Sequence, residues 1–129
     1  MGTRKDALAW LNRNGAIVDG EIFTSKFYIP SQSWTGKNAW WIQIPLKRLQ
    51  PKQGLLIHIL CQSSPGSSEF HYLKIPADYL LENLHGMALM GEKMINLFLS
   101  AEPENLFQDE RGNGRIWFNQ FFKNGDQMK

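Results

Sequence analysis

The sequence predicts an α+β fold: one domain over residues 1–129, with a mixed, mostly antiparallel sheet flanked by an N-terminal helix and a second helix near residues 76–86. The first observation is an internal echo. Residues 39–49 and 70–80 each hold a β-favouring run, an Ile-Pro pair and a short helical turn that ends in leucine. The second is size and composition, because 129 residues with 43% hydrophobic content suffice for one core but not for two.

The first expected elements are a helix over residues 3–14 and a β-favouring segment over residues 16–28. Thr3 can cap the helix, and Gly15 supplies the left-handed residue that often follows a helix end. The Asp19-Gly20 pair in the second segment is typical of a tight turn, so this segment is either a short hairpin or one bulged strand. A polar loop around Trp34 follows.

The central expected elements are a strand over residues 39–44, a helical turn over 46–50, and strands over 55–61 and 70–75. Proline cannot donate to a central ladder, so the chain should leave the sheet after each Ile-Pro pair, at Pro45 and Pro76. The first connection is too short for a parallel crossover, so strand 55–61 should run antiparallel to strand 39–44. Strand 55–61 is apolar on both faces, which predicts a central strand that forms a hairpin with 70–75.

The last expected elements are a helix over residues 76–85, a strand over 94–99 and a turn at Asn113-Gly114. The connection before 94–99 is long enough for a crossover, so that strand is expected to run parallel to strand 70–75. Phe121 and Phe122 are expected to close the core. The echo has two explanations, a duplicated β-Pro-α-β unit or a common way for a chain to leave a sheet, and the second is the more frequent.

The net charge of +2 hides an uneven distribution along the chain. Residues 1–53 carry eight basic and three acidic residues, whereas residues 54–129 carry six basic and nine acidic ones. A basic half can bind a polyanion or pair with the acidic half.

A segment that interleaves aromatic rings with cations is the leading candidate site. Bases stack on exposed rings and lysines follow phosphates, so this composition predicts non-catalytic binding of an anionic polymer such as a flexible nucleic acid. In strand 39–44, Trp40 and Trp41 point to opposite faces, so at least one should be in the core. Trp34, in its polar loop, either closes the core from above, the commoner case, or is held out for a ligand. The candidate ligand-binding residues are Lys26, Trp34, Lys37, Lys47, Arg48 and Lys52.

Two histidines and one charge cluster are the candidates for an enzyme. One register of the predicted hairpin would set His58 opposite His71, where two imidazoles could act as acid and base or begin a metal site. Hydrogen-bonded core histidines are the commoner alternative. Asp109 and Glu110, beside Arg111 and Arg115, could hold a divalent ion and a phosphate, although a solvated turn with weak local ion pairs is the commoner structure.

The order of helix, strands, helix and strand is similar to the core of restriction-type nucleases. Those enzymes need a carboxylate followed two residues later by lysine, and no predicted strand carries this pair; Glu69-Phe70-His71 is the nearest approximation. The sequence therefore leaves three interpretations: a nucleic-acid-binding domain, a metal-dependent nuclease-like or other hydrolytic enzyme, and a protein-interaction module.

The other sequence patterns narrow the class of protein. Dinucleotide, P-loop, serine-hydrolase and zinc-protease motifs are missing, so we expect no cofactor and no metal. No apolar run approaches the roughly 18 residues of a membrane span, and no signal peptide is recognisable. One cysteine, Cys61, fits a reducing compartment. These patterns predict a soluble, cytoplasmic protein.

Overall fold

The structure, a computed structural model, describes residues 3–16, 20–49, 54–91 and 93–123. The helices are α1 (Thr3–Arg13) and α2 (Ala77–Glu82), with single 3-10 turns η1 (Leu46–Leu49), η2 (Leu84–Gly86), η3 (Pro103–Asn105) and η4 (Asn119–Phe121). The strands are β1 (Glu21–Ser25), β2 (Ala39–Pro45), β3 (Leu56–Gln62), β4 (Phe70–Pro76), β5 (Ala88–Met90), β6 (Met94–Ser100) and β7 (Phe122–Lys123). The predicted α+β class and N-terminal helix are confirmed. Gly15 follows α1 with φ of 69°, as a helix C-terminus favours.

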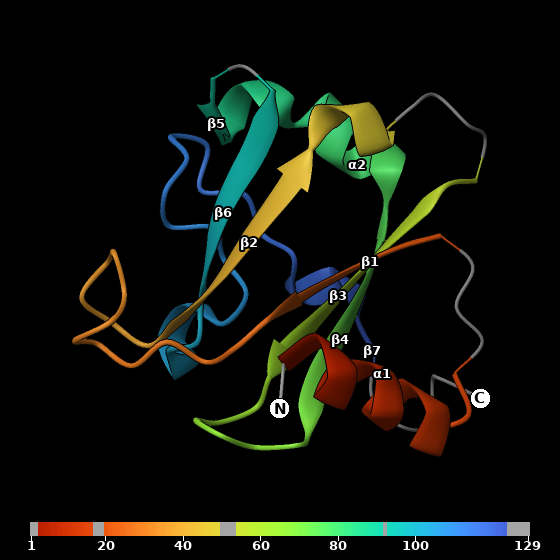
Figure 1. The fold of residues 1–129 in the computed structure, drawn as a ribbon. Coiled ribbons are helices and arrows are strands. Elements are labelled where there is room, and N and C mark those ends of the chain that lie inside the picture. The colour runs from red at the N-terminus through yellow and green to blue at the C-terminus, as the bar shows by residue number, and fades with distance from the viewer. Residues whose placement is uncertain (1–2, 17–19, 50–53, 92, 124–129) are drawn as a thin grey trace.

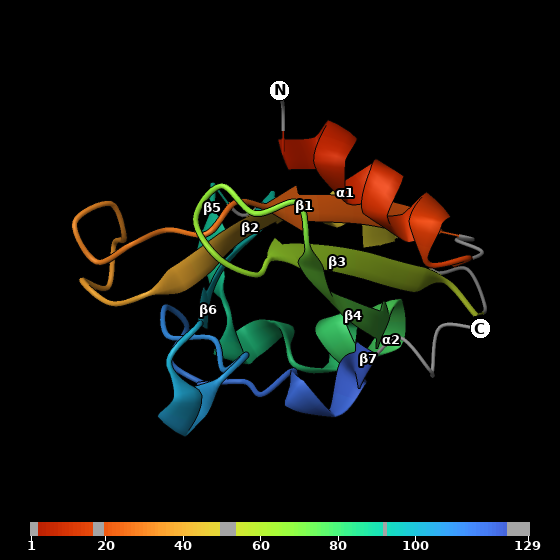
Figure 2. The same ribbon diagram turned by 90° about the horizontal axis from the view of Figure 1, so that it is seen from below.

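The strands divide between two sheets (Figure 1). Sheet A has the order β1-β3-β4-β7, with β1 parallel to β3 and the other pairs antiparallel. Sheet B has the order β2-β6-β5 and is antiparallel throughout. Figure 2 shows α1 lying across the side of sheet A that faces away from α2. Sheet A is mixed and mostly antiparallel, as predicted, but the strands divide between two sheets where the sequence predicted one.

The central hairpin is confirmed. β3 lies between β1 and β4, and its antiparallel register with β4 pairs Ile57 with Ile75 and Cys61 with His71. Ser63–Glu69 closes the hairpin, where the Ser63 N–H donates to the Glu69 carbonyl. The expected turn at Asp19-Gly20 includes Asp19, which lies outside the described residues. The strand that follows it, β1, begins at Glu21.

The chain passes from one sheet to the other after each of the two Ile-Pro pairs. The strands on either side of each pair are therefore not neighbours in one sheet, as the sequence predicted they would be. β2 leaves sheet B through η1 and the chain returns as β3 in sheet A, so β2 and β3 are not paired. β4 leaves sheet A through α2, and β6 joins sheet B antiparallel to β2 and β5, not parallel to β4. The prolines end both strands as predicted, and Ile44 and Ile75 are both 0% exposed. The helical turns after them take the chain across the edge of the core.

The main core lies between the sheets, and a smaller cluster lies between α1 and the outer face of sheet A. Trp40 ties the two sheets together, because its indole N–H donates to the Gln62 carbonyl at 2.7 Å. Phe118 is fully buried and Phe121 packs against the core at its edge, whereas Phe122 is more exposed and stacks on Phe107. No helix in the described ranges is long and apolar enough to cross a membrane.

Candidate functional site

The outer face of sheet B carries the residues that alternate with the core positions of β2 and β6. Ile42 and Ile44 point into the core, so Trp41 and Gln43 point outward. Trp41 is directly opposite Phe98 in the β2–β6 register, and Gln43 is opposite Asn96. Directly opposed residues share one face of a sheet, so these side chains lie together on the outer face of sheet B, where Trp41 is exposed and its neighbours cover Phe98 and Asn96.

Four rings gather at the end of this surface where β2 begins. Trp41 and Phe98 are nearly parallel, with an interplanar angle of 13° and centroids 5.8 Å apart. Tyr28 meets Trp41 edge-on at 6.3 Å, and Trp34 lies 5.6 Å from Phe98. The Trp41 indole N–H donates to Asn96 Oδ1 at 2.5 Å, which fixes the ring on the sheet. We call Tyr28, Trp34, Trp41 and Phe98 the aromatic patch.

The loop that carries Trp34 is held by its own hydrogen bonds. Ser33 and Thr35 join through their hydroxyls at 2.9 Å, and the Thr35 N–H donates to Ser33 Oγ. At the end of the loop, the Asn38 N–H donates to the Glu102 carboxylate at 2.9 Å. The Trp34 side chain is nevertheless on the surface, and the residue is 60% exposed. The expectation that Trp34 closes the core is therefore wrong, because the ring lies on the surface against Phe98 and Arg111.

Two cations lie over rings of the aromatic patch, and a third, Lys37, lies against Glu110, the residue before Arg111. The Arg111 guanidinium lies 4.5 Å from the Trp34 ring centroid and 5.6 Å from that of Phe98. The Lys26 ammonium lies 5.0 Å from the Tyr28 centroid. Lys37 is 3.9 Å from a Glu110 carboxylate oxygen and mostly exposed, an ion pair of the kind that contributes little to stability. Of these cations, Lys26 therefore lies on a ring at one edge of the patch and Arg111 on two rings at the other.

Asp109 organises the loop that presents Arg111. The side chain of Asp109 is 0% exposed and accepts three backbone N–H bonds, from Phe98 and Arg111 at Oδ1 and from Gly112 at Oδ2. Burial raises the pKa of this carboxyl, and the three N–H bonds oppose that shift. Gly112 is required next to it, since a Cβ there would lie 2.4 Å from the Gly86 carbonyl oxygen. The charge cluster is therefore not a solvated turn: Asp109 is a buried anchor.

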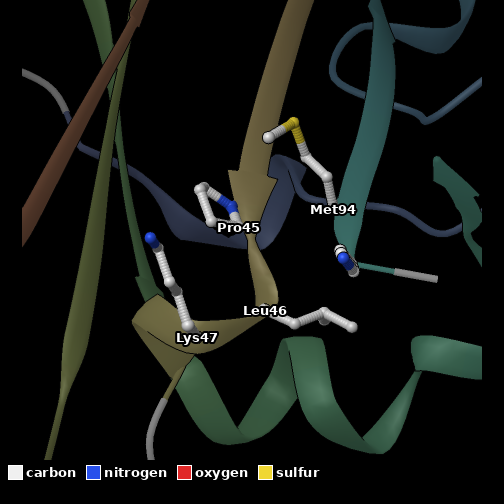
Figure 3. Close-up of a pocket in the computed structure, with 5 residues that line it drawn as sticks. Pro45, Leu46, Lys47 and Met94 are labelled. Atoms are coloured by element: carbon white, nitrogen blue, oxygen red, sulfur yellow. The ribbon is translucent and has the colours of Figure 1, made fainter. Parts of the chain in front are cut away.

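The remaining cationic candidates lie at the other end of β2. Lys47 and Arg48 are in η1, directly after Pro45. Arg48 pairs with Glu21 of β1 at 2.5 Å, which draws it toward sheet A. Lys47 lines a pocket of about 460 Å³ with Pro45, Leu46, Lys93 and Met94 (Figure 3). Lys52 lies outside the described residues.

The two histidines do not meet. The register pairs His58 with Lys74 and His71 with Cys61, so alternation sets the histidines on opposite faces of sheet A. His58 is fully buried and forms a 2.6 Å hydrogen bond with the Tyr72 hydroxyl. His71 is half-buried among Trp40, Phe107 and Phe122, and this burial lowers the pKa of its imidazole.

The other titratable candidates also hold structural positions. Glu110 accepts an amide N–H from Asn105 at 3.3 Å, and its side chain is only 10% exposed. Cys61 is a buried free thiol whose pKa burial raises, so it is not an activated nucleophile. Within the described part of the chain, no three His, Cys, Asp or Glu side chains gather as metal ligands would.

The sequence did not point to Phe98 or Lys93 as members of this surface, and it placed Arg111 only in the charge cluster with Asp109 and Glu110. Phe98 stands in an apolar run, so its side chain looks like one more core residue. Alternation along the strand marks it as outward once its neighbours Leu97 and Leu99 are assigned to the core. Arg111 and Lys93 come from the acidic half of the chain, and only the folded arrangement brings them to β2.

Comparisons with protein-family models, with curated proteins and with solved structures find no match to this chain.

Proposed function

We propose that the protein binds single-stranded or otherwise flexible nucleic acid through the aromatic patch and the cations around it. The observation that carries the proposal is the exposure of Trp34. This residue is 60% exposed, on a loop that is held by hydrogen bonds between its own residues. Its ring lies beside the parallel rings of Trp41 and Phe98 and beside Arg111. A large exposed ring on an ordered loop stabilises no core, which favours a role in binding. The ordering of the loop before binding reduces the entropy that a ligand would have to overcome.

The chemistry of the patch suits an anionic chain of aromatic units. Every base has a π-face, so stacking on protein rings is tolerant of sequence and contributes about 1–3 kcal/mol per base. Lys26 and Arg111 stand beside those rings, and Lys37 pairs with Glu110 next to Arg111. These cations would meet the phosphates that follow each stacked base. Binding would accordingly be weakly sequence-specific and strongly salt-dependent.

The test is a titration of tryptophan fluorescence with single-stranded oligonucleotides at low and at physiological salt. We expect quenching as bases stack, and an affinity that falls as salt rises. Trp34→Ala should weaken binding by about 5- to 150-fold, which is the loss of one base-stacking contact of 1–3 kcal/mol. Trp117→Ala is the matched control, because Trp117 is 42% exposed and its carbonyl is held by Tyr79 beside α2.

Two outcomes would contradict the proposal. Oligonucleotides that fail to bind even at low salt would leave the patch as a protein-docking surface. An equal loss of affinity in the Trp34 and Trp117 variants would show that binding does not depend on the patch. The hydrolytic alternative receives no support from His58 and His71, which lie on opposite faces of sheet A.

A further inference from the structure

Beyond the aromatic patch, the outer face of sheet B continues to a second feature, the pocket at the end of β2. Along β2 the outward positions are Trp41, Gln43 and Pro45, so the row of side chains that begins in the patch ends at the pocket. Trp41 and Pro45 are four residues apart, which is about 13 Å along a strand. The pocket therefore lies on the same face as the patch and within reach of one bound strand.

The pocket combines an apolar floor with two cations. Pro45 faces Met94 across the β2–β6 pair, and Met94 extends toward β2 (Figure 3). The Leu46 N–H donates to the Lys93 carbonyl at 2.9 Å, which holds the two lysine-bearing segments side by side. Lys47 and Lys93 are both exposed, and within the described ranges neither has an ion-pair partner. Figure 3 shows the Lys47 side chain extending from η1 toward the level of Pro45.

An apolar floor beside two cations complements a nucleotide, whose base or sugar is apolar on its faces and whose phosphate is anionic. A volume of about 460 Å³ lies within the range of small-molecule pockets. We propose that the pocket is a second subsite for the same strand: one nucleotide lies over Pro45, Leu46 and Met94, and its phosphate contacts Lys47 and Lys93. This inference rests on the proposed function.

The inference makes the length of the ligand measurable. At a rise of about 3.4 Å per nucleotide in a stacked strand, the separation of about 13 Å corresponds to roughly four nucleotides. A thymidine dinucleotide is then too short to reach from Trp41 to the pocket, whereas a thymidine hexanucleotide is long enough. The parent protein should therefore bind the hexanucleotide more tightly, and the affinity should rise most steeply between two and six nucleotides.

The decisive comparison uses the double variant Lys47→Gln/Lys93→Gln and a charge-matched control, Lys5→Gln/Lys123→Gln. Lys5 is on α1 and Lys123 is in β7, both in the layers formed with sheet A. The pocket variant should bind the hexanucleotide no more tightly than the dinucleotide, while its dinucleotide affinity stays that of the parent. Each neutralised phosphate of a single strand contributes a slope of about 0.7. The hexanucleotide plot of log affinity against log salt should therefore flatten by about 0.7 in the pocket variant.

The other outcomes separate the two proposals. If both oligonucleotides bind equally well, or if the pocket variant behaves as the control does, the second subsite is overturned while the aromatic patch stands. If neither oligonucleotide binds the parent protein at low salt, both proposals fail together.

Discussion

The tryptophans of this protein have different roles, and the role of each depends on its position along a strand or in a loop. Trp40 and Trp41 are neighbours in β2, yet Trp40 is 1% exposed and ties the two sheets together, while Trp41 stands on the outer face. Strand alternation alone separates them. Strand alternation does not apply to Trp34, because this residue lies in a loop. Hydrogen bonds between its neighbours Ser33 and Thr35 hold that part of the loop.

Asp109 should be important for the stability of the fold, because its carboxylate accepts hydrogen bonds from three backbone N–H groups. In Asp109→Asn, one acceptor oxygen becomes an N–H donor, and at least one buried N–H is left facing another donor. An unsatisfied buried group costs about 1–3 kcal/mol, so we expect the free energy of unfolding to fall by that amount in urea denaturation. Binding of oligonucleotides should weaken too, because the Arg111 N–H is one of the three.

The control for that variant is Asp78→Asn, at an exposed position in the first turn of α2. A surface substitution of this kind changes stability by less than about 0.5 kcal/mol. A denaturation midpoint for the Asp109 variant equal to that of the Asp78 variant would show that the three hydrogen bonds do not hold the loop.

Among the elements, the two strand–Ile-Pro–turn units fix where each strand ends. Ile44 and Ile75 occupy equivalent positions in them, and both are fully buried in the main core. Ile75→Ala should lower the free energy of unfolding by about 2–4 kcal/mol, as a large-to-small change in a core does. Leu81→Ala, at a residue of α2 that is 38% exposed, removes a similar volume outside the core and should cost much less. Similar midpoints for the two variants would contradict the assigned core.

The sequence predicted these elements well because each depends on local patterns. Proline lacks an N–H, serine and glycine favour the turn after β3, and β3 is apolar on both faces since it is buried on both. What the local patterns could not specify is the sheet that each strand joins. Loop length excludes a parallel β2–β3 pair but does not reveal that η1 crosses from one sheet to the other.

At the scale of the whole molecule, the candidate site is assembled from both halves of the chain. The excess of basic residues in 1–53 pointed to this half of the chain, which supplies Lys26, Trp34 and Lys37. Phe98 joins the patch from the acidic half because β6 pairs with β2 across sheet B, and Arg111 comes from the same half to lie over Trp34. Composition along the chain therefore predicted the chemistry of the surface but not its full membership, which depends on pairing between distant segments.

The stability of the folded molecule should depend on pH through His71. His71 lies among three aromatic rings, and desolvation lowers the pKa of its imidazole below the ordinary value of 6.5. Well above pH 6.5 the imidazole is neutral in both the folded and the unfolded chain. As the pH falls below that value, the unfolded chain binds a proton first, so the free energy of unfolding must decrease until the folded-state pKa is reached.

Replacing the imidazole with a ring that cannot titrate removes this contribution. His71→Phe keeps an aromatic side chain beside Phe107 and Phe122, so the stability difference between parent and variant should be constant above about pH 7. Below about pH 6.5 the parent should lose stability relative to the variant. Urea denaturation at half-unit steps from pH 8 to pH 5 measures both curves, and parallel curves across that interval would show that the folded protein binds the proton at His71 as readily as the unfolded chain does.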